Sequence, residues 1–246
     1  MKTAIVTGGS RGIGAAMVYR LGELGYNVVI NYNSDSSKQL CDEIKEKIEA
    51  GGKSKVATIQ ADVSTYESCK KIVDFAVETF GKQVDVLVNN AGVTNNMAFH
   101  EMDHKDYEWL MNINLMSNLH MCRLVLPYMV ENKSGNIINI SSVGGLMGVA
   151  YQGDYCASKS GVIGLTRSLA MEYGKLGIRI NAIAPGMIWT DMLRGVDQDQ
   201  VAALKQSIPL GEIGEVEEIA STMEFLIKSN YMTGQTVSPN GGLVMP

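Results

Sequence analysis

The chain of 246 residues has little of what marks several large classes of protein. It contains five prolines, four cysteines, three histidines and two tryptophans, and aromatic residues make up 7 % of it. Hydrophobic residues reach 46 % and no Gly-X-Y period occurs, so the composition excludes a disordered chain, a collagen and a coiled coil. The cysteines are far apart and form no Cys-x-x-Cys pair. This argues against a zinc ribbon or a thioredoxin-type site and fits reduced thiols in a cytoplasm.

The chain also has no strong excess of positive or negative charge and no long apolar segment. The net charge of −5 gives no general reason for nucleic acid or an anionic membrane to bind. The longest uncharged run, residues 134–153, is interrupted by asparagines, serines and glycines and is not typical of a membrane span. The chain begins Met1-Lys2-Thr3 and enters an apolar segment at once, so we expect no secretory leader. These features predict a cytoplasmic protein.

Short β-branched segments alternate with longer amphipathic ones from end to end. The predicted strands are Thr3–Thr7, Asn27–Asn31, Lys55–Ala61, Val84–Asn89, Gly135–Ile140, Ile178–Ala184 and Gln235–Ser238. Apolar residues recur at helical spacing between them. This alternation predicts an α/β protein with a single Rossmann-type, doubly wound parallel sheet of about seven strands and helices on both faces. No linker or internal repeat interrupts the pattern, so residues 1–246 are expected to form one domain.

Glycine is abundant, with 26 residues, and Gly8, Gly12 and Gly14 stand in a turn directly after the first predicted strand. The turn reads Thr7-Gly8-Gly9-Ser10-Arg11-Gly12-Ile13-Gly14 and a predicted helix follows. Such a turn lets backbone N–H groups and the helix N-terminus approach a pyrophosphate. The spacing is neither that of a Walker loop nor Gly-x-Gly-x-x-Gly. Its position between the first strand and helix favours a dinucleotide site over a purely structural turn.

The neighbouring residues favour NADP(H) over NAD(H). Enzymes that use NAD place a carboxylate after the second strand to bind the ribose 2′-hydroxyl. Here Asn31 and Tyr32 stand there, and no acidic residue occurs before Asp35. Arg11 adds a guanidinium in the turn, which suits a 2′-phosphate, although a solvated surface arginine is the alternative.

Tyr155 and Lys159 are four residues apart in a predicted helix, so both side chains are expected on one face. A free tyrosine has a pKa of about 10 and is a sluggish proton donor near neutrality. A neighbouring ammonium stabilises the phenolate and is expected to lower that pKa. A Tyr-x-x-x-Lys pair is common by chance, so it gains meaning only from its companions.

Those companions follow in order along the chain: Asn89-Asn90-Ala91-Gly92, Asn114, Ser142, and Pro185-Gly186. With the glycine-rich turn and the tyrosine–lysine pair, they resemble the short-chain dehydrogenase/reductases over essentially the whole chain. The tail, residues 231–236 followed by Asn240-Gly241-Gly242, is similar to the branch of 3-oxoacyl-[acyl-carrier-protein] reductases and acetoacetyl-CoA reductases.

The resemblance implies NADPH-dependent reduction of a 3-oxoacyl thioester to the 3-hydroxyacyl thioester, in a homotetramer. It implies that Tyr155 is the general acid and that Lys159 lowers its pKa and holds the nicotinamide ribose. It further implies that Ser142 holds the substrate carbonyl oxygen and that Asn114 supports a water-linked proton relay. Donors aimed at the oxygen on which negative charge grows would stabilise the transition state of such a reduction.

The site residues expected on these grounds form three sets. The expected NADP(H) contacts are Gly8, Ser10, Arg11, Gly12, Ile13, Gly14, Asn31, Tyr32, Asp62, Val63, Asn89, Ala91, Gly92, Tyr155, Lys159, Pro185, Gly186, Ile188 and Thr190. The expected substrate contacts are Ser142, Gln152, Tyr155 and Met187, and no metal ligand is expected. The segment from Ile188 into a short predicted helix, Gln198–Ser207, is a candidate lid over the substrate.

The acyl carrier is left open by the sequence. Many carrier-protein reductases have Arg-Asp where this chain has Asn95-Asn96, and arginines where it has Lys133 and Leu176. Lys133, Lys175 and Arg179 are candidates for a basic patch that an acidic carrier protein would need. Gln152 and Phe99 instead resemble acetoacetyl-CoA reductases. Both carriers, and a broader ketone or alcohol oxidoreductase, are therefore retained.

Three other functions compete with this interpretation. His100-Glu101-Met102-Asp103-His104 spells the zinc-peptidase signature, which needs both histidines on one turn of one helix. Asp103 is expected to cap a helix, so the two histidines would lie on either side of the helix start. A serine hydrolase lacks support because Gly-x-Ser-x-Gly is absent. A protein that binds NADP(H) without turnover is the third alternative, and the intact set of Asn114, Ser142, Tyr155 and Lys159 argues against it.

Overall fold

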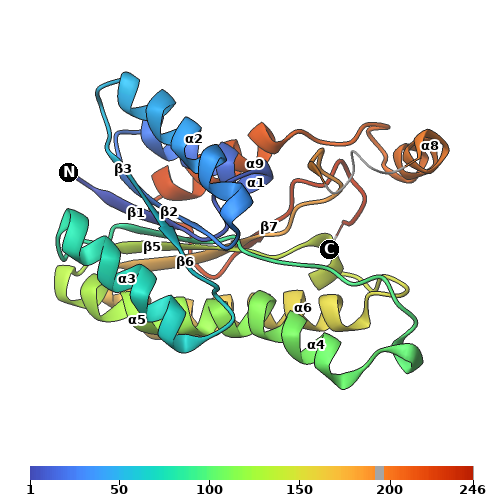
Figure 1. Ribbon diagram of the computed structural model, residues 1–246. Helices are drawn as coiled ribbons and strands as arrows, with labels where there is room; N and C mark the ends of the chain where they lie inside the picture. The colour runs from blue at the N-terminus through green and yellow to red at the C-terminus, as the bar shows by residue number, and fades with distance from the viewer. Residues whose placement is uncertain (192–196, 246) are drawn as a thin grey trace.

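The computed structural model describes residues 1–191 and 197–245. Within them, seven strands form one parallel sheet in the order β3-β2-β1-β4-β5-β6-β7 (Figure 1). The strands are β1 (Thr3–Val6), β2 (Asn27–Tyr32), β3 (Val56–Gln60), β4 (Val86–Asn89), β5 (Gly135–Ile140), β6 (Ile178–Ile183) and β7 (Thr236–Val237). The winding reverses between β1 and β4, so the predicted doubly wound sheet is confirmed. Ligands of such sheets bind beyond the carboxyl ends of the strands, near the reversal.

The strands are hydrophobic on both faces because helices cover both. Every residue of β1 and β2 is buried. Their β-branched side chains suit an extended backbone that packs on two sides.

The last strand is shorter than the sequence predicted. β7 has two residues instead of the four expected at Gln235–Ser238. Gly234 precedes it with a φ of +71°, a left-handed conformation outside the strand region, and Pro239 follows with no N–H to donate. The regular strand is therefore confined to Thr236 and Val237, although backbone hydrogen bonds to β6 and the residues after it extend from Gly234 to Pro239.

Long helices form a layer on each face of the sheet (Figure 1). The helices on one face are α1 (Gly12–Glu23), α2 (Lys38–Ala50) and α9 (Val216–Lys228), and those on the other are α3 (Tyr66–Phe80), α5 (Ser117–Asn132) and α6 (Gly153–Tyr173). Each layer closes its own apolar core. Met17 and Met223 belong to the first core, and Ile72 and Met121 belong to the second.

Short helical segments complete the chain. They are η1 (Asp35–Ser37), η2 (Phe99–Glu101), α4 (His104–Met111), the π-helical η3 (Asn112–Met116), η4 (Val143–Gly145), η5 (Gly174–Leu176) and α8 (Gln198–Ser207). The predicted cap of α4 is confirmed, since the Asp103 carboxylate accepts a hydrogen bond from the N–H of Lys105 at 2.9 Å. Across the part of the chain that the structure describes, none of the helices combines the length and the apolar character needed to cross a membrane.

Candidate active site

The predicted site motifs follow β1, β4, β5 and β6, and these strands run in the same direction. Their carboxyl ends therefore meet at one edge of the sheet. Backbone contacts join the motifs there. The N–H of Thr7 donates to the carbonyl of Val88 at 3.1 Å, and the N–H of Val143 donates to the carbonyl of Pro185 at 3.0 Å. The structure thus brings together segments that are up to 180 residues apart in sequence.

The glycine-rich turn is compact. Gly8 has a φ of +63°, and a Cβ on Gly14 would lie 2.2 Å from the carbonyl oxygen of Gly8. A larger residue at position 14 would push the first turn of α1 away from β1. The backbone N–H groups of this turn and the helix N-terminus can therefore approach an anion closely. Ser10 is buried in the turn, whereas Arg11 is exposed where α1 begins.

Two residues that sequence reasoning missed hold this turn in place. The side-chain amide of Asn90 donates to the carbonyls of Thr7 and Gly8, at 3.0 and 2.9 Å. The hydroxyl of Thr7 accepts from the N–H groups of Asn90 and Ala91, at 3.0 and 3.1 Å. Thr7 belongs to the glycine-rich turn and Asn90 to the Asn-Asn-Ala-Gly motif, and this membership was the signal in the sequence that could have identified them. The contact itself joins residues some 80 positions apart.

Asn89 and Asn31 point into the protein. The Asn89 amide donates to Asn139 at 2.9 Å, and Asn139 donates in turn to the hydroxyl of Thr166 at 2.9 Å. The Asn31 amide donates to the carbonyl of Ala61 at 2.8 Å. Any contact from Asn89 or Asn31 to a cofactor would thus come from the backbone.

The remaining expected cofactor residues lie around the same edge. Tyr32 and Val63 are buried, Asp62 is exposed and accepts from the N–H of Ser64, and Ile13 is half-buried. Thr190 lies against the glycine-rich turn, since a Cβ on Gly12 would be 3.5 Å from its methyl group. The segment after Pro185-Gly186 therefore crosses the turn. Ile188 there is buried and forms a bridge with Gly214.

Tyr155 and Lys159 share one face of α6, as predicted. The Lys159 Nζ lies 5.8 Å from the centre of the Tyr155 ring and donates to the carbonyl of Ile140 at 2.9 Å. Lys159 is only 4 % exposed. Because burial disfavours the charged form, the pKa of Lys159 is lowered to about 8. The ammonium thus titrates much closer to neutrality than a surface lysine.

The pKa of Tyr155 differs from the sequence expectation. Burial raises this pKa, and a hydrogen bond with Ser142 lowers it in part. The lowered pKa that the sequence predicted rested on the neighbouring ammonium alone, because spacing along a helix does not show how deeply the pair is buried. The ring also packs beside Gly144, where a Cβ would lie 3.2 Å from it. The phenol is thereby held between the β5 loop and α6.

Asn114 lies in the π-helical turn η3, a kind of local distortion that is frequent at functional sites. Its side-chain oxygen accepts from the N–H of Val93 at 2.8 Å, and its amide donates to the Val93 carbonyl at 2.8 Å and to Ser158 at 3.2 Å. A Cβ on Gly92 would be 3.3 Å from the Lys159 Nζ and 3.4 Å from the Asn114 Oδ1. Asn114, Lys159, Tyr155 and Ser142 are therefore neighbours in space.

The expected substrate residues border this cluster. Gln152 precedes α6 and donates to Asn96 at 2.6 Å. Met187 is half-buried and its carbonyl accepts from the N–H of Gly214 at 3.0 Å. The candidate lid falls partly outside the described residues, because 192–196 lie within it. Its helix α8 is observed at Gln198–Ser207, the predicted bounds, and projects from the body of the molecule (Figure 1).

The zinc alternative finds no support in the geometry. His100 belongs to η2 and His104 begins α4, so the two histidines do not share one helix. Among residues 1–191 and 197–245, no three His, Cys, Asp or Glu side chains are grouped to hold a metal ion.

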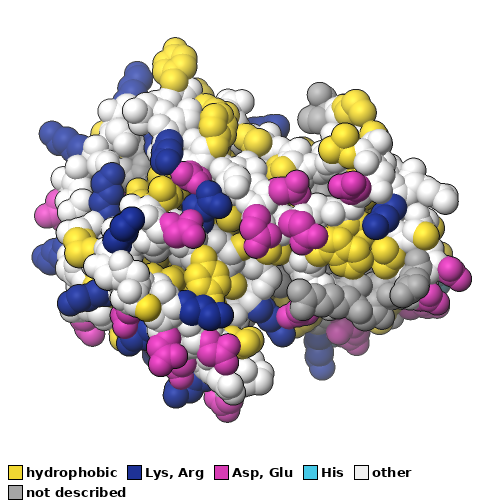
Figure 2. Space-filling model, turned by 90° about the horizontal axis from the view of Figure 1, so that it is seen from above, with side chains coloured by type: hydrophobic (Ala, Val, Ile, Leu, Met, Phe, Trp, Pro, Cys, Tyr) yellow, Lys and Arg dark blue, Asp and Glu magenta, His cyan; other side chains and the backbone are white. Residues whose placement is uncertain are grey.

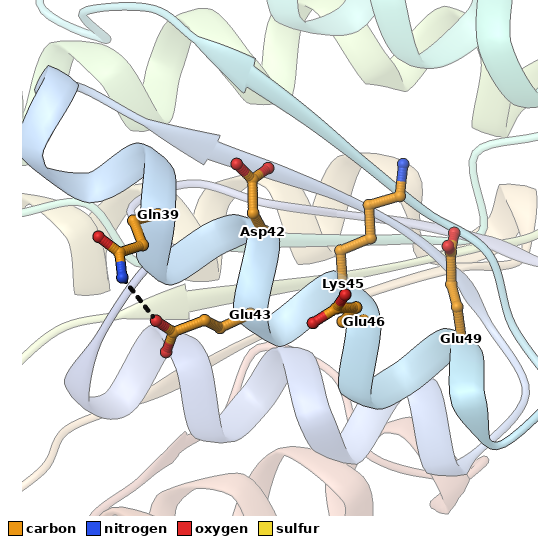
Figure 3. A pocket seen from close by; sticks show the side chains of 6 residues that line it. All are labelled: Gln39, Asp42, Glu43, Lys45, Glu46 and Glu49. Atoms are coloured by element: carbon orange, nitrogen blue, oxygen red, sulfur yellow. Dashed lines mark hydrogen bonds between the residues drawn. The ribbon is translucent and has the colours of Figure 1, made fainter.

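A shallow hollow on α2 lies apart from these residues (Figure 3). Its walls are Gln39, Asp42, Glu43, Lys45, Glu46 and Glu49, all side chains of that one helix. Gln39 and Glu43 are hydrogen-bonded to each other at 3.1 Å. The hollow contains none of the predicted site residues.

Comparison with known proteins agrees with this geometry. A family model described as short chain dehydrogenase matches residues 2–201. The 3-oxoacyl-[acyl-carrier-protein] reductase FabG of Staphylococcus epidermidis is 41 % identical, with 99 % of each chain covered. The 3-oxoacyl-[acyl-carrier-protein] reductase of Synechocystis is 38 % identical, with 99 % of this chain and 97 % of that one covered.

A solved structure is also similar along nearly the whole chain. It is a blue fluorescent protein from a metagenomic library in complex with NADPH, with a TM-score of 0.93 and 37 % identity. The alignment covers 99 % of this chain and 98 % of that one. The chain belongs to the short-chain dehydrogenase family of oxidoreductases.

Proposed function

We propose that the protein reduces a 3-oxoacyl thioester to the 3-hydroxyacyl thioester with NADPH. The observation that carries the proposal is the cluster of Ser142, Tyr155, Lys159 and Asn114 beside a glycine-rich turn. The two relatives named 3-oxoacyl-[acyl-carrier-protein] reductase support the substrate class, and the NADPH complex of the similar structure supports the cofactor.

The residues present fit NADPH. The turn from Gly8 to Gly14 leaves a cradle that a side chain would fill, at the N-terminus of α1, and this suits a pyrophosphate. Arg11 is exposed beside it and would pair with the 2′-phosphate. Thr190 and Ile188 would border the nicotinamide half. When bound, NADPH supplies a hydride to the carbonyl carbon of the substrate.

The protein's own groups would act on the substrate oxygen. Ser142 and Tyr155 present hydroxyl donors to the oxygen that becomes negative, which stabilises the transition state. Tyr155 then gives its proton to that oxygen. A tyrosine is protonated near neutrality, and burial adds to this because it raises the pKa of Tyr155 further. Lys159, fixed by the carbonyl of Ile140, would hold the nicotinamide ribose.

Asn114 would support the return of a proton to Tyr155. Its amide is locked between Val93 and Ser158 and cannot rotate freely. Ser158 in turn donates to the carbonyl of Tyr155 at 2.7 Å. The Asn114 side chain thus sits in a fixed network that leads to the tyrosine.

Acyl carrier protein is the carrier favoured by the relatives' names, and CoA is the alternative. The proposed basic patch is weaker than the sequence predicted, because the Arg179 guanidinium donates to the carbonyls of Leu226 and Ile227. Lys133 lies before β5 and Ser142 after it. Six strand residues separate them, or roughly 20 Å at 3.3 Å per residue. Lys133 therefore lies at the opposite edge of the sheet from the loop that carries Ser142.

The proposal includes one domain over residues 1–246, a homotetramer and a cytoplasmic location. One continuous sheet supports a single domain. Exposed apolar side chains, among them Phe225 and Leu119, support self-association. The four cysteines all lie in the described part of the chain and are free, which fits a reducing compartment.

The decisive experiment compares the wild type with Tyr155→Phe. We expect the wild type to oxidise NADPH with acetoacetyl-CoA and with an acyl-carrier-protein thioester. The variant keeps the ring but lacks the proton, so its kcat should fall on the order of 100-fold or more. NADPH fluorescence titration is the control for binding. Equal, slow turnover by both proteins across a panel of ketones would contradict the proposal and favour a protein that binds the cofactor without catalysis.

A further inference from the structure

The loop after β4, residues 90–98, is joined to the start of α6 by contacts that the proposed mechanism does not use. The N–H of Met97 donates to the carbonyl of Tyr151 at 3.0 Å. Gln152 donates to Asn96 at 2.6 Å, and the Asn95 Nδ2 donates to the Asp154 Oδ2 at 3.2 Å. We call these three contacts the clasp. They join three consecutive loop residues, 95–97, to three of the four residues directly before Tyr155.

Asp154 is the buried member of the clasp, with 4 % of its surface exposed. A buried carboxylate is costly unless donors satisfy both of its oxygens. Here Oδ2 accepts from Asn95, and Oδ1 accepts from the N–H of Tyr155 at 2.8 Å. That N–H is one of the four at the start of a helix that have no partner within it. One side chain therefore ties the loop to the backbone of Tyr155.

The backbone at Tyr151 is strained where the clasp begins. Its φ is +65°, a region that costs a non-glycine residue energy and persists only where the surroundings enforce it. Burial does not enforce it, because the Tyr151 side chain is 67 % exposed. The backbone contact with Met97 holds it instead, and the Phe99 ring closes on Gly153, where a Cβ would meet it at 3.1 Å.

The other end of the loop is fixed as well. Val93 is bonded through both its N–H and its carbonyl to the side chain of Asn114. The loop is therefore bonded to Asn114 near its beginning and to the residues before Tyr155 near its end.

We propose that Asn95 and Asp154 are positioning residues for Tyr155. The clasp sets the first turn of α6 so that the phenol faces Ser142 and Lys159. This inference rests on the proposed function. Asn95 and Asp154 themselves touch the loop and the helix backbone and transfer no proton.

A charge-swap cycle tests the pairing, with N95D, D154N and the double variant N95D/D154N. N95D places two carboxylates against each other in a half-buried contact. We expect the repulsion between the two charges to move the loop away from the helix. Misplacing a reacting group by about 1 Å costs on the order of 100-fold in rate, so we expect kcat to fall 10- to 100-fold. D154N should stay near the wild type, because the Asn95 amide can turn over and present its oxygen.

The double variant should restore kcat, since the new amide can donate to the new carboxylate and still accept from Tyr155. The dissociation constant for NADPH should not change in any of the three. Asn132→Asp is the matched control, because it makes the same change at an exposed position at the far end of α5. Loss of kcat in N95D without recovery in the double variant, or no loss in N95D, would overturn the proposal.

Hydrogen exchange provides a readout that needs no substrate. The Tyr155 amide should exchange faster in N95D and in D154A than in the wild type, and at the wild-type rate in the double variant. If the wild type reduces no thioester, the proposed function fails, but this measurement still tests whether the clasp positions Tyr155. Unchanged exchange of the Tyr155 amide in both N95D and D154A would overturn the proposal. Should N95D not fold, D154A and the double variant carry the same comparison.

Discussion

At the scale of residues, the site places a lysine and a tyrosine in a setting where burial outweighs their attraction. Lys159 reaches the carbonyl of Ile140 with one donor and is otherwise enclosed. Its charged form is disfavoured, which is why its pKa falls to about 8 from 10.5. A buried ammonium also weakens the folded state, so its presence indicates a role in chemistry rather than in stability.

Lys159→Met should therefore stabilise the protein at pH 7 while it abolishes reduction. The depressed pKa corresponds to roughly 3 kcal/mol, and loss of the bond to Ile140 offsets part of it, leaving about 1 to 2 kcal/mol. The folded protein releases this proton near pH 8 and the unfolded chain near pH 10.5. The advantage of the variant should thus be full below pH 8 and disappear as the pH rises to 10.5.

Urea unfolding at several pH values measures this difference, without cofactor and at one protein concentration. Lys38→Met, at an exposed lysine, is the control and should change little at any pH. A difference in the free energy of unfolding between Lys159→Met and the wild type that stays constant from pH 7 to 10.5 would contradict the expectation.

Arg11 is the residue that we propose for cofactor choice. Arg11→Ala removes the guanidinium proposed to meet the 2′-phosphate, and a charge-assisted pair of this kind contributes about 1.5 kcal/mol. We expect NADPH to bind about tenfold more weakly and NADH to bind as before. Fluorescence titration with both cofactors measures this. Tighter binding of NADH than NADPH by the wild type would count against the assignment.

At the scale of elements, the predicted strands occur in the predicted order and most boundaries agree within one or two residues. Strand and helix patterns in the sequence reflect burial on one or two faces, so they carry this information. The sequence could not show that β7 is cut to two residues, nor that the turn between α4 and α5 is π-helical. Both depend on how neighbouring elements pack.

The junction of β1 and α1 should tolerate no side chain at Gly14. In Gly14→Ala the new Cβ would meet the Gly8 carbonyl, and backbone cannot give way as a flexible side chain can. We expect a loss of about 1 to 3 kcal/mol in the free energy of unfolding, together with weaker NADPH binding. Urea unfolding and fluorescence titration measure the two effects.

Gly174→Ala is the matched control for that substitution. Gly174 follows α6 with a helical φ of −57°, is exposed, and has no atom within 4 Å of an added Cβ. Alanine there should stabilise the protein by up to about 1 kcal/mol. A Gly14→Ala protein as stable as this control would contradict the close packing of Gly14 against the Gly8 carbonyl.

At the scale of the whole molecule, charges of both signs are scattered over the face above α1, α2 and α9 (Figure 2). Acidic side chains gather there towards α8 and adjoin an apolar patch (Figure 2). Exposed apolar residues occur on both sides of the sheet. Leu119 lies on α5 and is 38 % exposed, and Phe225 lies on α9 and is 53 % exposed.

A tetramer of the common dihedral kind needs at least two different two-fold interfaces. We therefore expect Leu119→Glu and Phe225→Glu each to reduce the proposed tetramer to a dimer, and the double variant to give a monomer, because a buried unpaired carboxylate is costly. Light scattering after gel filtration measures the mass. A wild-type monomer, or a tetramer that survives both changes, would refute this assembly.

The sequence by itself determined the order of strands and helices, the sheet they form and the identity of the site motifs, because local periodicity and spacing encode them. Only the tertiary structure decided what those residues meet. It turned Asn89 inward and Asn90 onto the glycine turn, tied Arg179 to α9, and bound Asn95 to Asp154. These are contacts between residues dozens of positions apart, and the burial that sets the pKa of Tyr155 and Lys159 arises from the same packing.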